Sequence, residues 1–281
     1  MNGDSGANSP GAFASGAAAP APAGTPVLAL AGVDKRFGAV QALSDIHLEV
    51  AAGEVVALVG DNGAGKSTLV KIISGVFRAD AGEILINGRD GSVGSPREAQ
   101  ALGIATVFQD LALCDNLDVV ANLFLGQERS LASFLDEVEM EQEAWRLVRV
   151  LSAKIPSVRI PVAALSGGQR QTVAIARSLV GKPRIVLLDE PTAALGVAQT
   201  AEVLNLVERL REQGLGVILV THNMVDVRAV ADRIVVLRLG RNAASFTTSE
   251  VSTEDLVAAI TGASDNVVAA RERRQQDGTQ Q

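Results

Sequence analysis

The sequence predicts an α/β fold built around a mainly parallel β-sheet. Short apolar runs that end in a glycine, an aspartate or a threonine recur along the chain, and stretches with helical spacing of apolar residues separate them. This alternation is typical of a sheet covered by helices. With 281 residues, 47% of them hydrophobic, the chain is long and apolar enough for one large domain with a sizeable core.

Five apolar runs are predicted strands, and helical patterns lie between them. The strands are expected at 54–60, 83–87, 104–108, 184–189 and 216–221. Helices are expected at 66–74, from 166 to about 179, and at 198–211. Long helical patterns also fill 116–151, so we expect the stretch of about 110–180 to be an inserted subdomain built from helices alone.

Composition excludes several classes of protein. A single cysteine, Cys114, rules out an intrachain disulfide and a cysteine-rich zinc site. The net charge of −7, the 3% aromatic content and the lack of tyrosine argue against nucleic acid as a partner. No apolar run reaches the roughly 18–20 residues that a membrane-spanning helix needs.

The two ends of the chain differ in composition from the rest. Residues 1–26 are rich in Ala, Gly, Pro and Ser with one charge, Asp4, and residues 263–281 are polar. We expect a disordered leader and a polar tail around a folded domain at 27–262. The leader lacks the basic start and leucine-rich middle of a signal peptide, which indicates a cytoplasmic protein.

A glycine-rich loop joins the first predicted central strand to the helix after it. The loop reads Gly60, Asp61, Asn62, Gly63, Ala64, Gly65, Lys66 and Ser67, which fits the phosphate-binding pattern G-x-x-x-x-G-K-[ST]. Glycines let the backbone N–H groups point at phosphate oxygens, and the helix start attracts the anion. Lys66 would neutralise the outer phosphates, and the Ser67 hydroxyl would bind Mg²⁺.

The strand expected at 184–189 ends in two carboxylates, Asp189 and Glu190. A carboxylate at the end of a buried strand needs a partner, and a magnesium ion held with Ser67 would supply one for Asp189. Glu190 would then act as general base toward a water in line with the γ-phosphate. Taken alone, the pair could instead cap the turn before Pro191.

A third motif opens the helix expected from residue 166. It reads Leu165, Ser166, Gly167, Gly168 and Gln169. By itself this is an ordinary turn and helix cap, but before the two carboxylates it could form a second anion-binding helix end.

Together, the three motifs resemble the nucleotide-binding subunit of ATP-binding cassette (ABC) transporters, and the resemblance covers about 27–262. It implies a P-loop NTPase of RecA-like type, with a mainly parallel sheet, an antiparallel β subdomain and an inserted α-helical subdomain at about 110–180. It also implies ATP and Mg²⁺ as cofactors. The implied nucleotide-binding positions are Phe37, the loop from Gly60 to Ser67, Thr68, Ser166, Gly167, Gly168 and Gln169.

The resemblance also assigns roles to single residues. Gln109 matches the glutamine that touches Mg²⁺ or the attacking water, and His222 matches the histidine at the γ-phosphate; both join Glu190 and Lys66 as expected catalytic residues. Expected metal ligands are Ser67, Gln109 and Asp189. Without the family, Gln109 is equally a polar strand end. Phe37 matches the aromatic that stacks on adenine, although a phenylalanine is more often core.

Further segments resemble the monosaccharide-importer branch of the family. They are 118–126 (DVVANLFLG) and 221–224 (THNM), together with Gly196, which stands where the family usually has an aspartate between the two nucleotide sites. Many members of that branch carry two fused cassettes, whereas this chain has one, so a homodimer is expected. The resemblance implies a permease docked on 111–124, a periplasmic sugar-binding protein reached indirectly, and a place at the cytoplasmic face of the inner membrane.

Two other functions stay open at this point. One is an importer or exporter cassette for a different substrate. The other is a soluble ATP-driven switch acting on DNA repair or translation, which the acidic charge and the lack of a basic arm disfavour.

Overall fold

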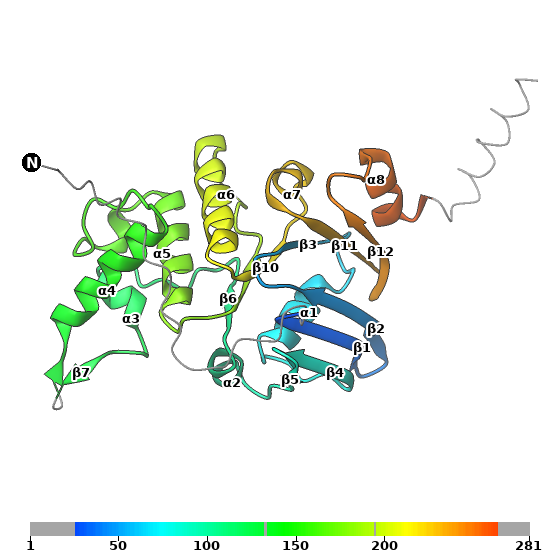
Figure 1. The fold of residues 1–281 in the computed structure, drawn as a ribbon, viewed down its shortest axis with the longest axis horizontal. Helices are drawn as coiled ribbons and strands as arrows, with labels where there is room; N and C mark the ends of the chain where they lie inside the picture. The colour runs from blue at the N-terminus through cyan, green and yellow to red at the C-terminus, as the bar shows by residue number, and fades with distance from the viewer. Residues whose placement is uncertain (1–25, 132–133, 194, 264–281) are drawn as a thin grey trace, which may run out of the picture.

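The computed structural model describes residues 26–131, 134–193 and 195–263. Its centre is a six-stranded sheet in the order β12-β11-β3-β10-β9-β6 (Figure 1). Neighbours pair in parallel except at β12, which is antiparallel to β11. The strands are β3 (Val55–Val59), β6 (Ile104–Val107), β9 (Ile185–Asp189), β10 (Gly216–Val220), β11 (Arg233–Arg238) and β12 (Arg241–Thr247).

The central strands are buried on both faces, which explains why they read as continuous apolar runs. In β9, Val186 and Leu188 belong to one core cluster, and Ile185 and Leu187 belong to another. The first cluster also contains side chains of α5 (Gly167–Leu179) and α6 (Val197–Glu212), and the second contains those of α1 (Lys66–Ile73). Successive side chains of a strand point to opposite faces, so helices must cover both.

A second, antiparallel sheet in the order β2-β1-β4-β5 packs with α1 in the second cluster. Its strands are β1 (Leu28–Phe37), β2 (Val40–Val50), β4 (Ala81–Ile86) and β5 (Arg89–Asp90). This sheet confirms the expected antiparallel β subdomain. The remaining helices are α2 (Pro96–Ala101), α7 (Met224–Val230) and α8 (Thr253–Thr261).

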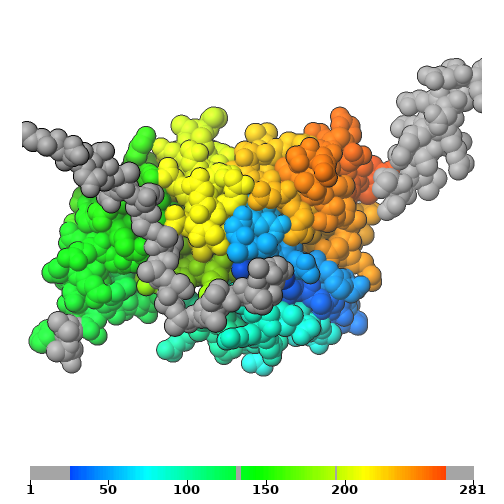
Figure 2. All heavy atoms as spheres, in the orientation of Figure 1, coloured from blue at the N-terminus to red at the C-terminus, as the bar shows by residue number. Residues whose placement is uncertain are grey.

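The inserted subdomain forms one end of the molecule (Figure 2). It contains α3 (Val119–Phe124), α4 (Glu137–Val150), a 3-10 turn (Val162–Ala164) and α5. It is not built from helices alone, so that expectation was wrong: β7 (Ser130–Leu131) and β8 (Phe134–Leu135) pair as a small hairpin. Helix α3 stops before Gly126, whose φ is +78°, and Asp136 caps α4 by accepting from the Glu139 N–H, so neither helix extends into 126–136.

The expected leader and tail fall outside the described residues, apart from Pro26 and Ala263. Within the described ranges, none of the helices combines the length and apolarity needed to cross a bilayer.

The inserted subdomain depends on Phe124, which is 1% exposed. We expect Phe124→Ala to lower the free energy of unfolding by about 3–5 kcal/mol, because it removes a large buried ring and leaves a cavity. Phe134→Ala is the matched control, since Phe134 is 79% exposed and its loss should change stability by less than about 0.5 kcal/mol. Urea denaturation followed by circular dichroism measures both; equal effects would contradict the packing described for this subdomain.

Candidate functional site

Three loops meet at the carboxyl edge of the central sheet. Val220 of β10 lies level with Leu58 of β3 on one side and with Asp189 of β9 on the other. The chain leaves these strands into the glycine-rich loop, into Asp189-Glu190 and into Thr221-His222. The Glu190 N–H donates to the Val220 carbonyl over 2.8 Å, which joins two of the loops directly. Parallel strands place their carboxyl ends together, and this is where α/β folds bind ligands.

The glycines of the first loop are required by its shape. Gly60, Gly63 and Gly65 have φ of +151°, +80° and +103°. A Cβ on Gly60 would lie 2.2 Å from the Leu237 carbonyl oxygen, so no larger residue fits there. Helix α1 then begins at Lys66 without a side-chain cap, and Ser67 and Thr68 lie in its first turn. Its first N–H groups therefore have no side-chain acceptor, as expected of an anion-binding helix end.

Lys66 lies between the loop and the carboxylates. Its Nζ donates to the carbonyls of Gly60 (2.7 Å) and Asp61 (3.0 Å). Burial lowers the pKa of Lys66, while the carboxylates of Glu190, Asp61 and Asp189 act in the opposite direction. Within the described residues the hydrogen bonds of this half-buried ammonium go to neutral carbonyls, so it is well placed to exchange them for phosphate oxygens.

The charge of Asp189 is only partly compensated by its neighbours. Burial raises the pKa of Asp189 and the neighbouring Glu190 carboxylate raises it further, and together these two effects outweigh the opposite effects of Lys66 and Lys71. A divalent cation would relieve this repulsion. The donor set suits Mg²⁺, which is typically held by one or two carboxylates and hydroxyls together with phosphate oxygens, and Ser67 in the first turn of α1 would supply the hydroxyl.

Glu190 and His222 are in direct contact. The Glu190 Oε1 lies 2.9 Å from the His222 Nδ1, and the histidine side chain is 77% exposed. Glu190 has a φ of +50°, a left-handed conformation that is unusual for glutamate. Such strain persists only where the surroundings hold it, and it is often found at functional sites.

The motif at Ser166 lies apart from this edge. Ser166 caps α5 by accepting from the Gln169 N–H, and the Gln169 side chain accepts from the Ser166 N–H in return. A Cβ on Gly167 or Gly168 would meet side chains of α6 or of Leu195, not the glycine-rich loop. The structure therefore joins the loop, Asp189, Glu190 and His222 into one site and does not bring Ser166 to it.

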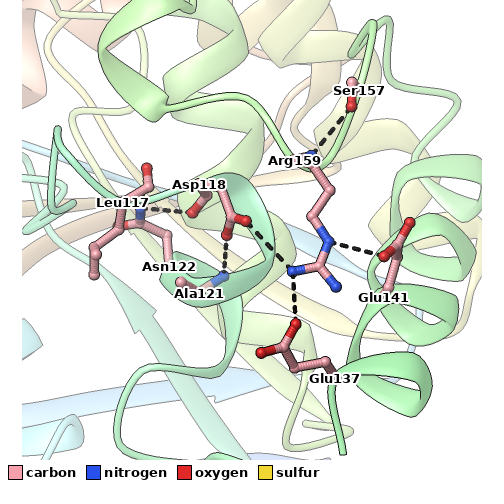
Figure 3. Close-up of polar contacts among 8 residues, drawn as sticks. All are labelled: Leu117, Asp118, Ala121, Asn122, Glu137, Glu141, Ser157 and Arg159. Carbon is pink, nitrogen blue, oxygen red and sulfur yellow. Dashed lines mark hydrogen bonds and ion pairs between the residues drawn. The ribbon is translucent and has the colours of Figure 1, made fainter.

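A polar network fixes the segment that leads to Ser166 (Figure 3). The Arg159 guanidinium contacts Glu141 at 2.8 Å, Glu137 at 3.4 Å and Asp118 at 3.6 Å. Asp118 also caps α3 by accepting from the Ala121 N–H at 2.7 Å. The network thus ties α3 and α4 to the approach to α5.

Gln109 is exposed just after β6, and the segment that follows it is held by a residue that sequence reasoning missed. Arg177 of α5 donates to the carbonyls of Leu111 (2.7 Å) and Ala112 (2.8 Å). Burial lowers the pKa of this guanidinium. The available signal was a basic residue inside the apolar stretch 173–179 of α5. Arg177 thus links the helix that begins after Ser166 to the segment after Gln109.

Phe37 stands at the end of β1 and is 43% exposed, so it is not a core residue. Its ring meets Phe77 edge to face with centroids 5.2 Å apart. The Lys35 Nζ lies 5.4 Å from the Phe37 centroid. The expected adenine-stacking role remains a prediction that this geometry permits.

Comparisons with known proteins agree with the geometry. The model of the ABC transporter family matches residues 43–193. The xylose/arabinose import ATP-binding protein XylG of Sulfolobus acidocaldarius is 43% identical over 84% of this chain and 94% of its own. The fructose import ATP-binding protein FrcA of Rhizobium meliloti is 42% identical over 85% and 95%. Several ribose or galactose import relatives are about twice as long, and the chain spans about half of their length.

Solved structures show the same fold. A nucleotide-free ATP-binding cassette from an ABC transporter matches with a TM-score of 0.74 at 26% identity, over 84% of this chain and 96% of that one. A dimeric cassette in a post-hydrolysis state with ADP and Pi matches with a TM-score of 0.67 at 29% identity, over 79% and 98%.

The raised pKa of Asp189 predicts how this side chain affects stability. The charged form is disfavoured in the fold, so the penalty is absent below the unfolded pKa and fully present above the folded one. At pH 7 and without nucleotide, we expect Asp189→Asn to raise Tm, and we expect Mg²⁺-ATP to raise Tm less in the variant than in wild type.

The control is Asp80→Asn, for which the pKa shift of the aspartate has the opposite direction. A hydrogen bond from Lys35 and another from the Arg36 N–H lower the pKa of Asp80, so its loss should lower Tm or leave it unchanged. Differential scanning calorimetry at pH 7 measures all three proteins. A lower Tm for nucleotide-free Asp189→Asn would contradict the charge balance described here.

Proposed function

The chain belongs to the ABC transporter family and is one of its ATPases, and on this premise we propose that it drives uptake of a monosaccharide through a membrane permease. The observation that carries the catalytic part is the contact of Glu190 with His222 beside the glycine-rich loop. The substrate class is supported by the relatives named for import of xylose, arabinose and fructose.

The proposed chemistry is attack of a water on the γ-phosphate. The loop N–H groups and Lys66 hold the phosphates, with Lys66 leaving the Gly60 and Asp61 carbonyls to do so. Ser67 and Asp189, joined by Gln109, would hold Mg²⁺, which supplies neutralisation of phosphate charge when bound. Glu190 accepts a proton from the water while the water oxygen bonds to the γ-phosphorus. The bond between the γ-phosphorus and the ADP oxygen breaks, and ADP leaves. His222 orients Glu190 and faces the γ-phosphate.

We infer that the working unit is a head-to-tail homodimer. Ser166, Gly167 and Gly168 begin a helix whose first N–H groups can bind an anion, yet they lie away from the site of their own chain. A second copy related by two-fold symmetry would bring each Ser166 to the γ-phosphate of the other, giving two equivalent composite sites. The solved dimeric cassette supports this arrangement.

The permease would dock in a cavity between the central sheet with α2 and the inserted subdomain. This cavity of about 270 Å³ is lined on one side by α2 and β6, and on the side of the inserted subdomain by Leu125, Gln127 and Arg177. The expected docking segment 111–124 needs narrowing, because Val119, Val120, Asn122, Leu123 and Phe124 are buried inside the subdomain. Residues 111–117 and this cavity remain as the proposed docking surface. In this proposal the docked chain would lie at the cytoplasmic face of the membrane, and a sugar-binding protein would act on the opposite face.

We expect Glu190→Gln to bind Mg²⁺-ATP without turning it over, because the base is lost while the loop and Lys66 remain. Light scattering after size-exclusion chromatography should then show a dimer with ATP and a monomer without it. Ser166→Arg in the same background should bind ATP and stay monomeric. If Glu190→Gln remains monomeric at saturating ATP, the homodimer is wrong.

The transport role is tested with the permease itself. Tagged wild-type chain should co-purify a polytopic membrane protein from its host membranes, and vesicles containing that complex and the binding protein should take up one radiolabelled monosaccharide when supplied with ATP. The same vesicles made with Glu190→Gln should take up none. If the vesicles hydrolyse ATP but take up none of the monosaccharides tested, the cassette serves another substrate.

A further inference from the structure

One buried carboxylate has no role in the chemistry described above. Asp226 of α7 is 2% exposed, and among the residues that the structure describes it is the one charged side chain buried this deeply. Burying a carboxylate is unfavourable unless strong hydrogen bonds compensate. The contacts that satisfy Asp226 therefore indicate why a charge is kept there.

Asp226 joins two loops of the catalytic edge. Its Oδ2 accepts from the Thr192 hydroxyl at 2.6 Å, and its Oδ1 accepts from the Asn223 side-chain amide at 3.0 Å. Thr192 lies two residues after Glu190, and Asn223 directly follows His222. The carboxylate therefore connects the segment behind the general base to the segment behind the histidine.

Both segments are held further by their own bonds. The Asn223 N–H donates to the Thr221 hydroxyl at 3.1 Å, and the Asn223 Oδ1 accepts from the Val225 N–H at 3.0 Å. On the other side, the Ala193 N–H donates to the Glu190 carbonyl at 3.1 Å. Movement of Thr192 or Asn223 would therefore move Glu190 or His222 with it.

We propose that Asp226, through Thr192 and Asn223, is a positioning residue that holds Glu190 and His222 at their contact distance; this rests on the catalytic roles given to those two residues above. Glu190 has a strained backbone, with a φ of +50°, and needs an external restraint. The bond to Thr192 supplies one from behind the reacting groups. Within the part of the chain that the structure describes, the Asp226 carboxylate bonds to Thr192 and Asn223 and not to the glycine-rich loop, so ATP affinity should not depend on it.

Three substitutions of threonine separate positioning from packing. Thr192→Val removes the hydroxyl at nearly constant shape, and Thr192→Ser keeps it. Thr248→Val is the control for the shape change alone, because the Thr248 hydroxyl is buried and has no hydrogen-bond partner among the described residues, whereas the half-buried Thr192 has one. We expect Thr192→Val to lower kcat by about tenfold to hundredfold, the scale of a misplacement of about 1 Å, with the Kd for ATP within about twofold. Thr192→Ser and Thr248→Val should keep wild-type kcat.

A double-mutant cycle tests whether Thr192 acts through Asp226. Asp226→Asn should lower kcat by a similar factor, and the double variant Thr192→Val, Asp226→Asn should be no slower than the slower single variant. The variants are measured as steady-state ATPase, with Tm and Kd for ATP on the same samples. Wild-type kcat in Thr192→Val, a fall in kcat matched by Thr248→Val, or effects that multiply in the double variant would each overturn the proposal.

Glu190→Gln and His222→Ala are assayed alongside. If both retain wild-type turnover, the catalytic assignment fails and the positioning role fails with it. If both are impaired while Thr192→Val and Asp226→Asn are not, the assignment stands and only the positioning role is wrong.

Discussion

The site depends on the parallel register of three neighbouring strands. Because β9, β10 and β3 end at the same edge of the sheet, the chain leaves the sheet there three times. The glycine-rich loop with Lys66 therefore lies beside the carboxylates of Asp189 and Glu190. Because both faces of the central sheet are covered, all residues of β3 and β10 are buried, and so are those of β9 up to Asp189. The strands are therefore closely packed, while Asp61, Asn62 and His222 beyond their ends are exposed to a ligand from solvent, which suits a site that holds phosphates in one geometry.

The charges at that edge are arranged for a ligand and not for the stability of the empty protein. Burial lowers the pKa of Lys66 and raises that of Asp189, so both groups are charged at a cost at neutral pH. A triphosphate with a divalent cation would satisfy both at once, the phosphates at Lys66 and the cation at Asp189. Binding of such a ligand can then shift the positions of these loops relative to one another. A conformational switch requires a ligand that binds one of its states more tightly in this way.

Sequence reasoning located what depends on local pattern. The glycine-rich loop, the strand ending in Asp189 and the helix capped by Ser166 all lie where their motifs placed them, because turn, cap and buried strand are determined by adjacent residues. The hairpin of β7 and β8 was missed because strands of two residues have no usable periodicity. Contacts across the fold were also missed: Arg177 reaches Leu111, and Thr192 reaches Asp226, over separations that no local pattern reports.

We propose that the glycine-rich loop at this edge is a single phosphate site in which Lys66 carries the charge. The decisive measurement is isothermal titration calorimetry with Mg²⁺-ATP on wild type and Lys66→Ala. Both proteins must first show the same Tm without nucleotide, so that a difference in binding is not a difference in folding. We expect one ATP per wild-type chain, and binding to Lys66→Ala at least about tenfold weaker, because a charged hydrogen bond to phosphate is worth about 1.5–3 kcal/mol. Equal affinities in the two proteins would contradict the account.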